Sequence, residues 1–134
     1  MARIVIDANG SVFGRLCSFA AKKALEGNEI IIVNSEKSII TGNKIDIIKK
    51  RRVLISKGGA AIKGPFFPRI SYMILKRCIR GMLPDYRRGI GKQAFSRIKC
   101  YNGMPKEFEN EKMIKSGKTK SLKYIELKEI SEKI

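Results

Sequence analysis

Two short β-branched runs with an amphipathic stretch between them begin the chain. Residues 4–6 (Ile-Val-Ile) predict a strand, and residues 30–33 predict a second strand covered on both faces, because every position in it is apolar. Between them, apolar residues spaced by three and four over residues 13–25 predict a helix, with Ser11 as its N-cap and Gly27 as its stop. This order indicates a βαβ unit and hence a parallel sheet.

The patterns in the next part of the chain are weaker. Residues 44–51 carry isoleucines on one side and predict a helix, and residues 53–55 (Val-Leu-Ile) can form a strand after it. The glycine and proline content of residues 57–68 predicts an extended loop. On a helical wheel, residues 69–80 divide into an apolar half and a half with four cations, so we expect a two-faced helix that ends at Gly81.

Residues 81–89 (GMLPDYRRG) place an apolar corner among arginines. Pro84 cannot readily continue a helix, so we expect Met82 and Leu83 to pack back against the apolar face of the preceding helix. An anchored turn of this kind directs the neighbouring cations outward from a rigid scaffold.

The rest of the chain predicts less regular structure. A helix over residues 89–97 and a strand over residues 98–101 follow the corner, and in the tail only residues 124–127 and the last few positions indicate order. A length of 134 residues suits one compact domain. We expect its core within residues 1–106 and a charged C-terminal extension over residues 107–134.

Charge is distributed unevenly along the chain. The sequence has 29 lysines and arginines against 12 aspartates and glutamates, a formal net charge of +17. Residues 1–36 are balanced, residues 37–106 carry eighteen bases against two acids for a net charge of +16, and the tail adds the last +1. An excess of this size in one section favours a polyanionic partner.

The cysteines and the N-terminus predict a cytoplasmic protein. Cys17, Cys78 and Cys100 are far apart and lie among apolar neighbours, which fits buried free thiols in a reducing compartment. No run approaches the ~20 apolar residues that cross a bilayer, and the N-terminus has no apolar signal-peptide segment. We therefore expect no membrane association.

Motifs for catalysis are weak. The turn at residues 7–14 has two glycines before a helix, where an anion can bind, but it fits neither common phosphate-loop pattern, and the glycines of residues 58–64 favour a flexible loop. The chain has no histidine, which excludes a His-based triad or a His-ligated zinc site. Asp7 and Glu36 could meet at one sheet edge, but Asp7 is better explained by hydrogen bonds to backbone amides of its turn. We predict no enzyme, cofactor, metal site or small-molecule substrate.

The basic section favours RNA as the polyanion. Between residues 69 and 97 most of the basic residues are arginines, and a guanidinium can bind two phosphate oxygens at once. Aromatic residues make up 7% of the chain, so contact with the backbone and grooves of folded RNA is favoured over stacking on single strands. The candidate phosphate contacts are Arg69, Arg77, Arg80, Arg87, Arg88, Lys92 and Arg97, with Lys44, Lys49, Arg52, Lys57 and Lys63 as a second group.

Several short motifs occur in a fixed order over about three quarters of the chain. They are Ile6-Asp7-Ala8 with Gly10, Gly14, Arg15 and Leu16; Val33-Asn34-Ser35-Glu36-Lys37 and Thr41-Gly42-Asn43-Lys44; Gly64-Pro65-Phe66; Arg80-Gly81-Met82-Leu83-Pro84; and Gly89, Ala94, Ile98 and Tyr101-Asn102-Gly103-Met104-Pro105. In this set the chain resembles the universal large-subunit ribosomal protein family numbered thirteen, and most closely its archaeal and eukaryotic branch.

The resemblance implies a three-layer α/β/α domain around a four-stranded parallel sheet, with basic extended loops. It also implies a structural protein of the large ribosomal subunit that binds large-subunit ribosomal RNA and neighbouring ribosomal proteins and supports subunit assembly and translation. Where the family usually has a histidine and a lysine after the Met-Leu-Pro corner, this chain has Asp85 and Tyr86. Arg87 and Arg88 can supply the charge there instead.

Two other classes stay open on the residues alone. The chain could be a small nucleotide-dependent enzyme that uses the turn after the first strand. It could also be a basic adaptor for acidic proteins or anionic membranes. Neither class explains the ordered motifs.

Overall fold

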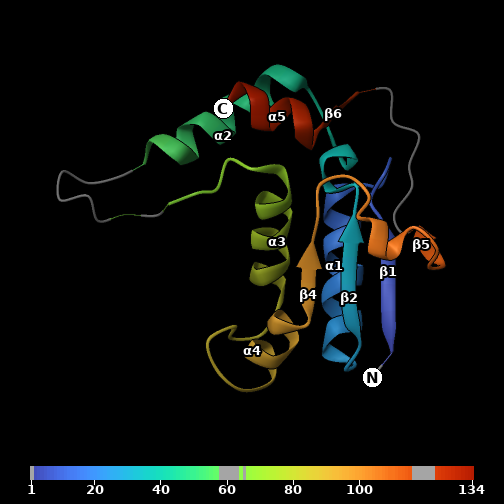
Figure 1. The fold of residues 1–134 in the computed structure, drawn as a ribbon. Helices are drawn as coiled ribbons and strands as arrows, with labels where there is room; N and C mark the ends of the chain where they lie inside the picture. The colour runs from blue at the N-terminus through green and yellow to red at the C-terminus, as the bar shows by residue number, and fades with distance from the viewer. Residues whose placement is uncertain (1, 58–63, 65, 116–122) are drawn as a thin grey trace.

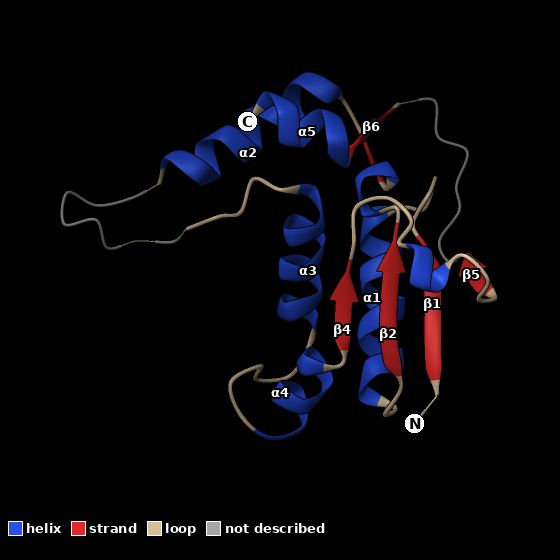
Figure 2. Ribbon diagram, viewed as in Figure 1, coloured by secondary structure: helices blue, strands red, loops and turns tan. Residues whose placement is uncertain are grey.

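A parallel β-sheet with the strand order β4-β2-β1-β5 lies at the centre of the protein (Figure 1). The computed structural model describes residues 2–57, 64, 66–115 and 123–134. The strands of this sheet are β1 (Arg3–Asp7), β2 (Glu29–Val33), β4 (Ile98–Cys100) and β5 (Met113–Lys115). The other elements are α1 (Phe13–Leu25), η1 (Ser35–Lys37), β3 (Ile39–Thr41), α2 (Lys44–Ser56), α3 (Ser71–Met82), α4 (Gly89–Ser96), η2 (Lys106–Phe108), β6 (Tyr124–Glu126) and α5 (Leu127–Lys133) (Figure 2).

Side chains are buried on both faces of this sheet. β1 and β2 pair in parallel, and α1 connects them along the chain, so the predicted βαβ unit is confirmed. Ile6 and Ile32 belong to a large core shared with α1 and α3, whereas Val5 and Ile31 belong to a smaller core with Phe108 of η2 on the other face. The predicted three-layer α/β/α fold around a four-stranded parallel sheet is confirmed.

The predicted strand at residues 53–55 is wrong, because α2 continues through these residues to Ser56. A short apolar run does not by itself distinguish a strand from a helix. Ile47 and Ile48 of α2 pack against the main core, and the fourth strand of the sheet is β5, for which the sequence carries no clear signal.

Of the three predicted signals at the ends of helices, Gly27 follows the C-cap of α1 with a φ of 101°, as predicted, whereas Ser11 and Gly81 need correction. Ser11 is not the N-cap of α1; Val12 holds that position, and the Ser11 hydroxyl donates to the backbone oxygen of Asp7 at 3.3 Å. Gly81 does not end α3, which runs one residue further. The helix stops at Leu83, whose extended backbone is the conformation favoured by a residue that precedes proline.

The end of the chain contributes to the core. β6 pairs antiparallel with β3, and α5 follows directly. The prediction of ordered structure for residues 124–127 and the last few positions is therefore confirmed. Ile125, Leu127 and Ile130 are fully buried in the main core. Part of the lysine- and glutamate-rich tail therefore packs as firmly as the strands.

The three cysteines are free, as predicted, but their environments differ. The buried Cys17 thiol lies 3.8 Å from the backbone oxygen of Leu75, and its hydrogen bond with Cys78 together with burial raises the pKa of Cys17. The same hydrogen bond lowers the pKa of the half-buried Cys78. Burial raises the pKa of Cys100 to about 12.

We expect alkylation of the native protein at pH 8 to modify Cys78 first, because the thiolate is the reactive form and Cys78 has the lowered pKa and is only half-buried, whereas Cys17 and Cys100 are buried. Mass spectrometry of the peptides after a short treatment with iodoacetamide measures this order. In denaturant all three thiols should react at similar rates. Equally fast modification of Cys17 in the native protein would contradict the packing of α1 against α3.

Candidate nucleic-acid interface

Three helices of the basic section lie on the side of the fold away from β5. α2, α3 and α4 all come from residues 37–106. α3 and α4 lie beside the β4 edge of the sheet, α2 lies above α3 next to α5, and β5 forms the other edge (Figure 1). The uneven charge along the sequence thus becomes an uneven charge across the molecule. Among the described residues, no ion pair involves the candidate contacts Arg69, Arg77, Arg80, Arg87, Arg88 and Lys92.

Aromatic rings lie beside the candidate contacts Arg77, Arg80 and Arg87 and beside Lys76, which was not among the candidates. The guanidinium carbon of Arg77 lies 4.4 Å from the centre of the Phe67 ring, and Lys76 Nζ lies 5.1 Å from the centre of the Phe95 ring. Arg77 also donates to the backbone oxygen of Phe66 at 3.1 Å. A ring attracts a cation through its quadrupole but does not neutralise it. These side chains are therefore held in position with their full charge.

Tyr86 links the cations of α3 to those of the loop that follows. Its ring centre lies 4.5 Å from the guanidinium carbon of Arg80 and 5.3 Å from that of Arg87, and 6.3 Å from the ring centre of Phe95. Arg87 Nε donates to the Tyr86 hydroxyl at 3.2 Å, and this bond, with the nearby cations, lowers the pKa of Tyr86. Sequence reasoning missed this role, because Tyr86 stood out only as a departure from the family pattern.

The Met-Leu-Pro corner is a packed turn. Leu83 is buried as predicted, although Met82 is 43% exposed, and Asp85 Oδ1 accepts a hydrogen bond from the Arg87 amide at 3.1 Å. Gly91 of α4 is buried against this turn, and a Cβ atom there would overlap with the backbone oxygens of Pro84 and Asp85. The corner fixes the loop between α3 and α4, and with it the cations on either side.

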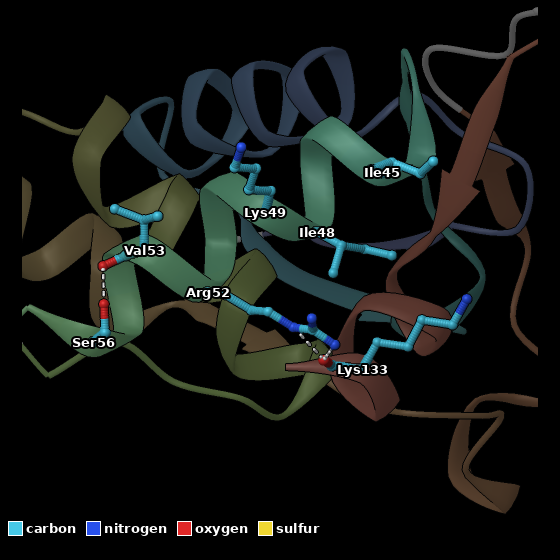
Figure 3. A pocket seen from close by; sticks show the side chains of 7 residues that line it. All are labelled: Ile45, Ile48, Lys49, Arg52, Val53, Ser56 and Lys133. Atoms are coloured by element: carbon cyan, nitrogen blue, oxygen red, sulfur yellow. Dashed lines mark hydrogen bonds between the residues drawn. The ribbon is translucent and has the colours of Figure 1, made fainter.

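The second group of candidates lies on and after α2, and part of it has internal partners (Figure 3). Arg52 Nε and Nη2 donate to the backbone oxygen of Lys133 at 3.0 and 2.8 Å, and Lys44 Nζ lies 3.5 Å from Glu129 Oε2. Both contacts join α2 to α5. Lys49 is exposed on the same helix and has no ion pair among the described residues.

The remaining candidates occupy different places. Arg97 is half-buried and donates from Nη1 to the backbone oxygen of Ala24 at 3.0 Å, where it satisfies a carbonyl at the C-terminal end of α1. Lys57 is exposed just after α2. Lys63 lies outside the described residues.

The turn after β1 is occupied by its own hydrogen bonds. Asp7 Oδ1 accepts from the Asn9 amide at 3.0 Å and from Asn34 Nδ2 at 3.1 Å, which confirms its predicted role in the turn. Glu36 Oε2 accepts from the Gly103 amide at 2.9 Å. In the part of the chain that the structure describes, no group of three acidic, histidine or cysteine residues could hold a metal ion. Within the same part, no helix has the length and apolar surface to cross a bilayer.

Comparison with known proteins gives a consistent result. The family model described as ribosomal protein L13 matches residues 2–107. Relatives named large ribosomal subunit protein uL13 include one from Methanosarcina barkeri, 45% identical over 97% of this chain and 96% of the relative, and one from Methanocaldococcus jannaschii, 47% identical over 96% and 94%. A third, from Thermoplasma acidophilum, is 44% identical over 83% and 80%.

Proposed function

Since the chain belongs to the ribosomal protein L13 family, we propose that it is a structural constituent of the large ribosomal subunit that binds large-subunit ribosomal RNA through its basic central section. It works in the cytoplasm within that subunit and supports subunit assembly and translation. It is not an enzyme. Its partners are the RNA and the neighbouring proteins of the large subunit.

The observation that carries this proposal is the row of uncompensated cations on α3 and the following loop. Lys76, Arg77, Arg80 and Arg87 contact aromatic rings and form no ion pair among the described residues. Cations fixed in this way lose little side-chain entropy when they bind phosphate, and they retain N–H donors for bidentate contact. Folded RNA carries closely spaced phosphates that cations of this kind can bind.

The proposed phosphate contacts fall into a main set and a second set. The main set is Arg69, Arg77, Arg80, Arg87, Arg88, Lys92 and Arg97, and the second set is Lys44, Lys49, Arg52, Lys57 and Lys63. Arg97 in the main set and Arg52 and Lys44 in the second also hold parts of the fold together. Their substitution is therefore expected to change stability as well as affinity.

The purified protein should bind fragments of large-subunit ribosomal RNA with an affinity that falls steeply as salt rises. If about eight cations displace counterions, the slope of log affinity against log salt should be roughly −6 to −7. Fluorescence anisotropy of labelled RNA fragments at a series of KCl concentrations measures this slope. A slope near zero would contradict the proposal.

Sucrose-gradient fractionation of a native lysate is the companion test in the cell. A tagged chain should migrate with the large subunit and stay there at moderate salt. Recovery in the light fractions alone would remove the support for a structural ribosomal role.

A further inference from the structure

A groove of about 550 Å³ runs between the segment before α3 and the outer side of that helix. Six apolar residues and four cations line it. Three of the apolar side chains are well exposed to solvent: Phe66 is 72% exposed, Ile70 47% and Met73 45%. The rings of Phe67 and Phe95 complete the apolar lining.

Among the described residues, the cations that line the groove are Arg69, Lys76, Arg77 and Arg80, and no acidic side chain lines it. Two of them are held by rings that also line the groove, Arg77 by Phe67 and Lys76 by Phe95. The groove therefore combines an exposed apolar surface with fixed positive charge. A partner that fits must carry a flat apolar part and negative charge within a short distance of each other.

We propose that this groove binds an unpaired nucleotide of ribosomal RNA, with the base against Phe66 and Met73 and the adjoining phosphates on Arg77 and Arg80. This inference rests on the proposed RNA-binding function and adds the kind of RNA structure that is bound. Paired bases inside a helix cannot reach an apolar surface, whereas bases in bulges and loops stack on aromatic side chains. The volume lies within the range of sites for small organic ligands, so one nucleotide fits.

The hydrogen bonds around Arg77 suit this arrangement. Its Nη1 donates to the backbone oxygen of Phe66, and its guanidinium lies over the Phe67 ring. A guanidinium has five N–H donors, so several remain for phosphate oxygens. The bond to Phe66 uses only the backbone, and truncation of the Phe66 side chain therefore leaves Arg77 in place. The base-binding and phosphate-binding parts of the groove can be changed separately.

The test compares two RNA hairpins that carry the same number of phosphates. One contains a bulge of three adenosines, and the other contains three abasic residues at the same positions. We expect the full-length protein to bind the adenosine bulge about fivefold to a hundredfold more tightly, the range that stacking of one base gives in alanine substitutions. The variant Phe66→Ala/Met73→Ala should bind both hairpins equally, with an unchanged salt slope.

The control is Ile45→Ala, which truncates a side chain of similar exposure, 74%, on α2 outside the groove. It should keep the preference for the adenosine bulge. Equal affinity of the unchanged protein for both hairpins, with a steep salt slope, would overturn this inference and leave the proposed function in place. A flat salt slope on both would contradict the proposed function itself.

Two further results would also count against a nucleotide in this groove. A preference for the adenosine bulge that survives Phe66→Ala/Met73→Ala would place the base elsewhere on the protein. Loss of the variant from the large subunit in gradients, without any base preference in the unchanged protein, would assign the groove to a neighbouring protein instead.

Discussion

The substitution Gly91→Ala is expected to destabilise the protein by about 3 kcal/mol, at the upper end of the cost of overpacking. Its Cβ would overlap with the backbone oxygens of Pro84 and Asp85, and neither atom belongs to a flexible side chain that could move aside. Either α4 or the corner before it must shift. For a domain of this size the midpoint of thermal unfolding, measured by circular dichroism, should decrease by about 10 °C.

Gly81→Ala is the matched control for this prediction. Gly81 also lies in a helix, and no atom lies within 4 Å of a Cβ placed there. Alanine is favoured over glycine inside a helix, so this variant should be more stable by about 0.5–1 kcal/mol. A similar loss of stability in both variants would show that the close approach at Gly91 is not what matters. Because the corner carries Tyr86, Gly91→Ala should also weaken RNA binding.

Reversal of charge at two positions of α3, Arg77→Glu/Arg80→Glu, is expected to lower affinity for ribosomal RNA on the order of a hundredfold or more, since hydrogen bonds to charged groups contribute about 1.5–3 kcal/mol each. The salt slope should also become shallower by about two, one for each lost phosphate contact. Both side chains are half-buried and lie over aromatic rings, so the folded state of the variant is checked by its circular dichroism spectrum.

A control with the same change of net charge separates local contact from overall attraction. Lys106 and Lys112 are both exposed. Lys106 begins η2, which packs over the sheet face opposite α3 through Phe108, and Lys112 directly precedes β5. Lys106→Glu/Lys112→Glu should lower affinity only slightly. An equal loss in both double variants would mean that the RNA is bound by net charge and not by the α3 surface.

Local patterns were sufficient for most elements of this fold. The βαβ unit follows from two continuous apolar strands and an amphipathic helix, and α3 and α4 follow from their helical spacing. The patterns failed where the signal was short or shared by two structures. Residues 53–55 are as suitable for a strand as for a helix, and β5 has only three residues in a charged tail.

The charge of the site could be predicted, but its organisation could not. The section from residue 37 to residue 106 has the composition of an RNA-binding surface before any folding is considered. Low aromatic content argued against base stacking, yet folding brings Phe66, Phe67, Phe95 and Tyr86 beside the cations of α3. Composition counts residues over the whole chain, whereas stacking depends on where a few of them meet.

The sequence by itself was therefore enough to determine the family, the fold class and the excess of positive charge. Each of them depends on motifs, apolar spacing or charges that lie close together along the chain. Tertiary structure alone decided which cations are tied to distant parts of the fold. Arg52 and Arg97 donate to backbone oxygens more than seventy positions away in sequence, while Arg77 and Arg80 lie over aromatic rings close to them along the chain. These two backbone oxygens become neighbours of Arg52 and Arg97 only through packing, and the order of residues along the chain does not show which distant positions will meet.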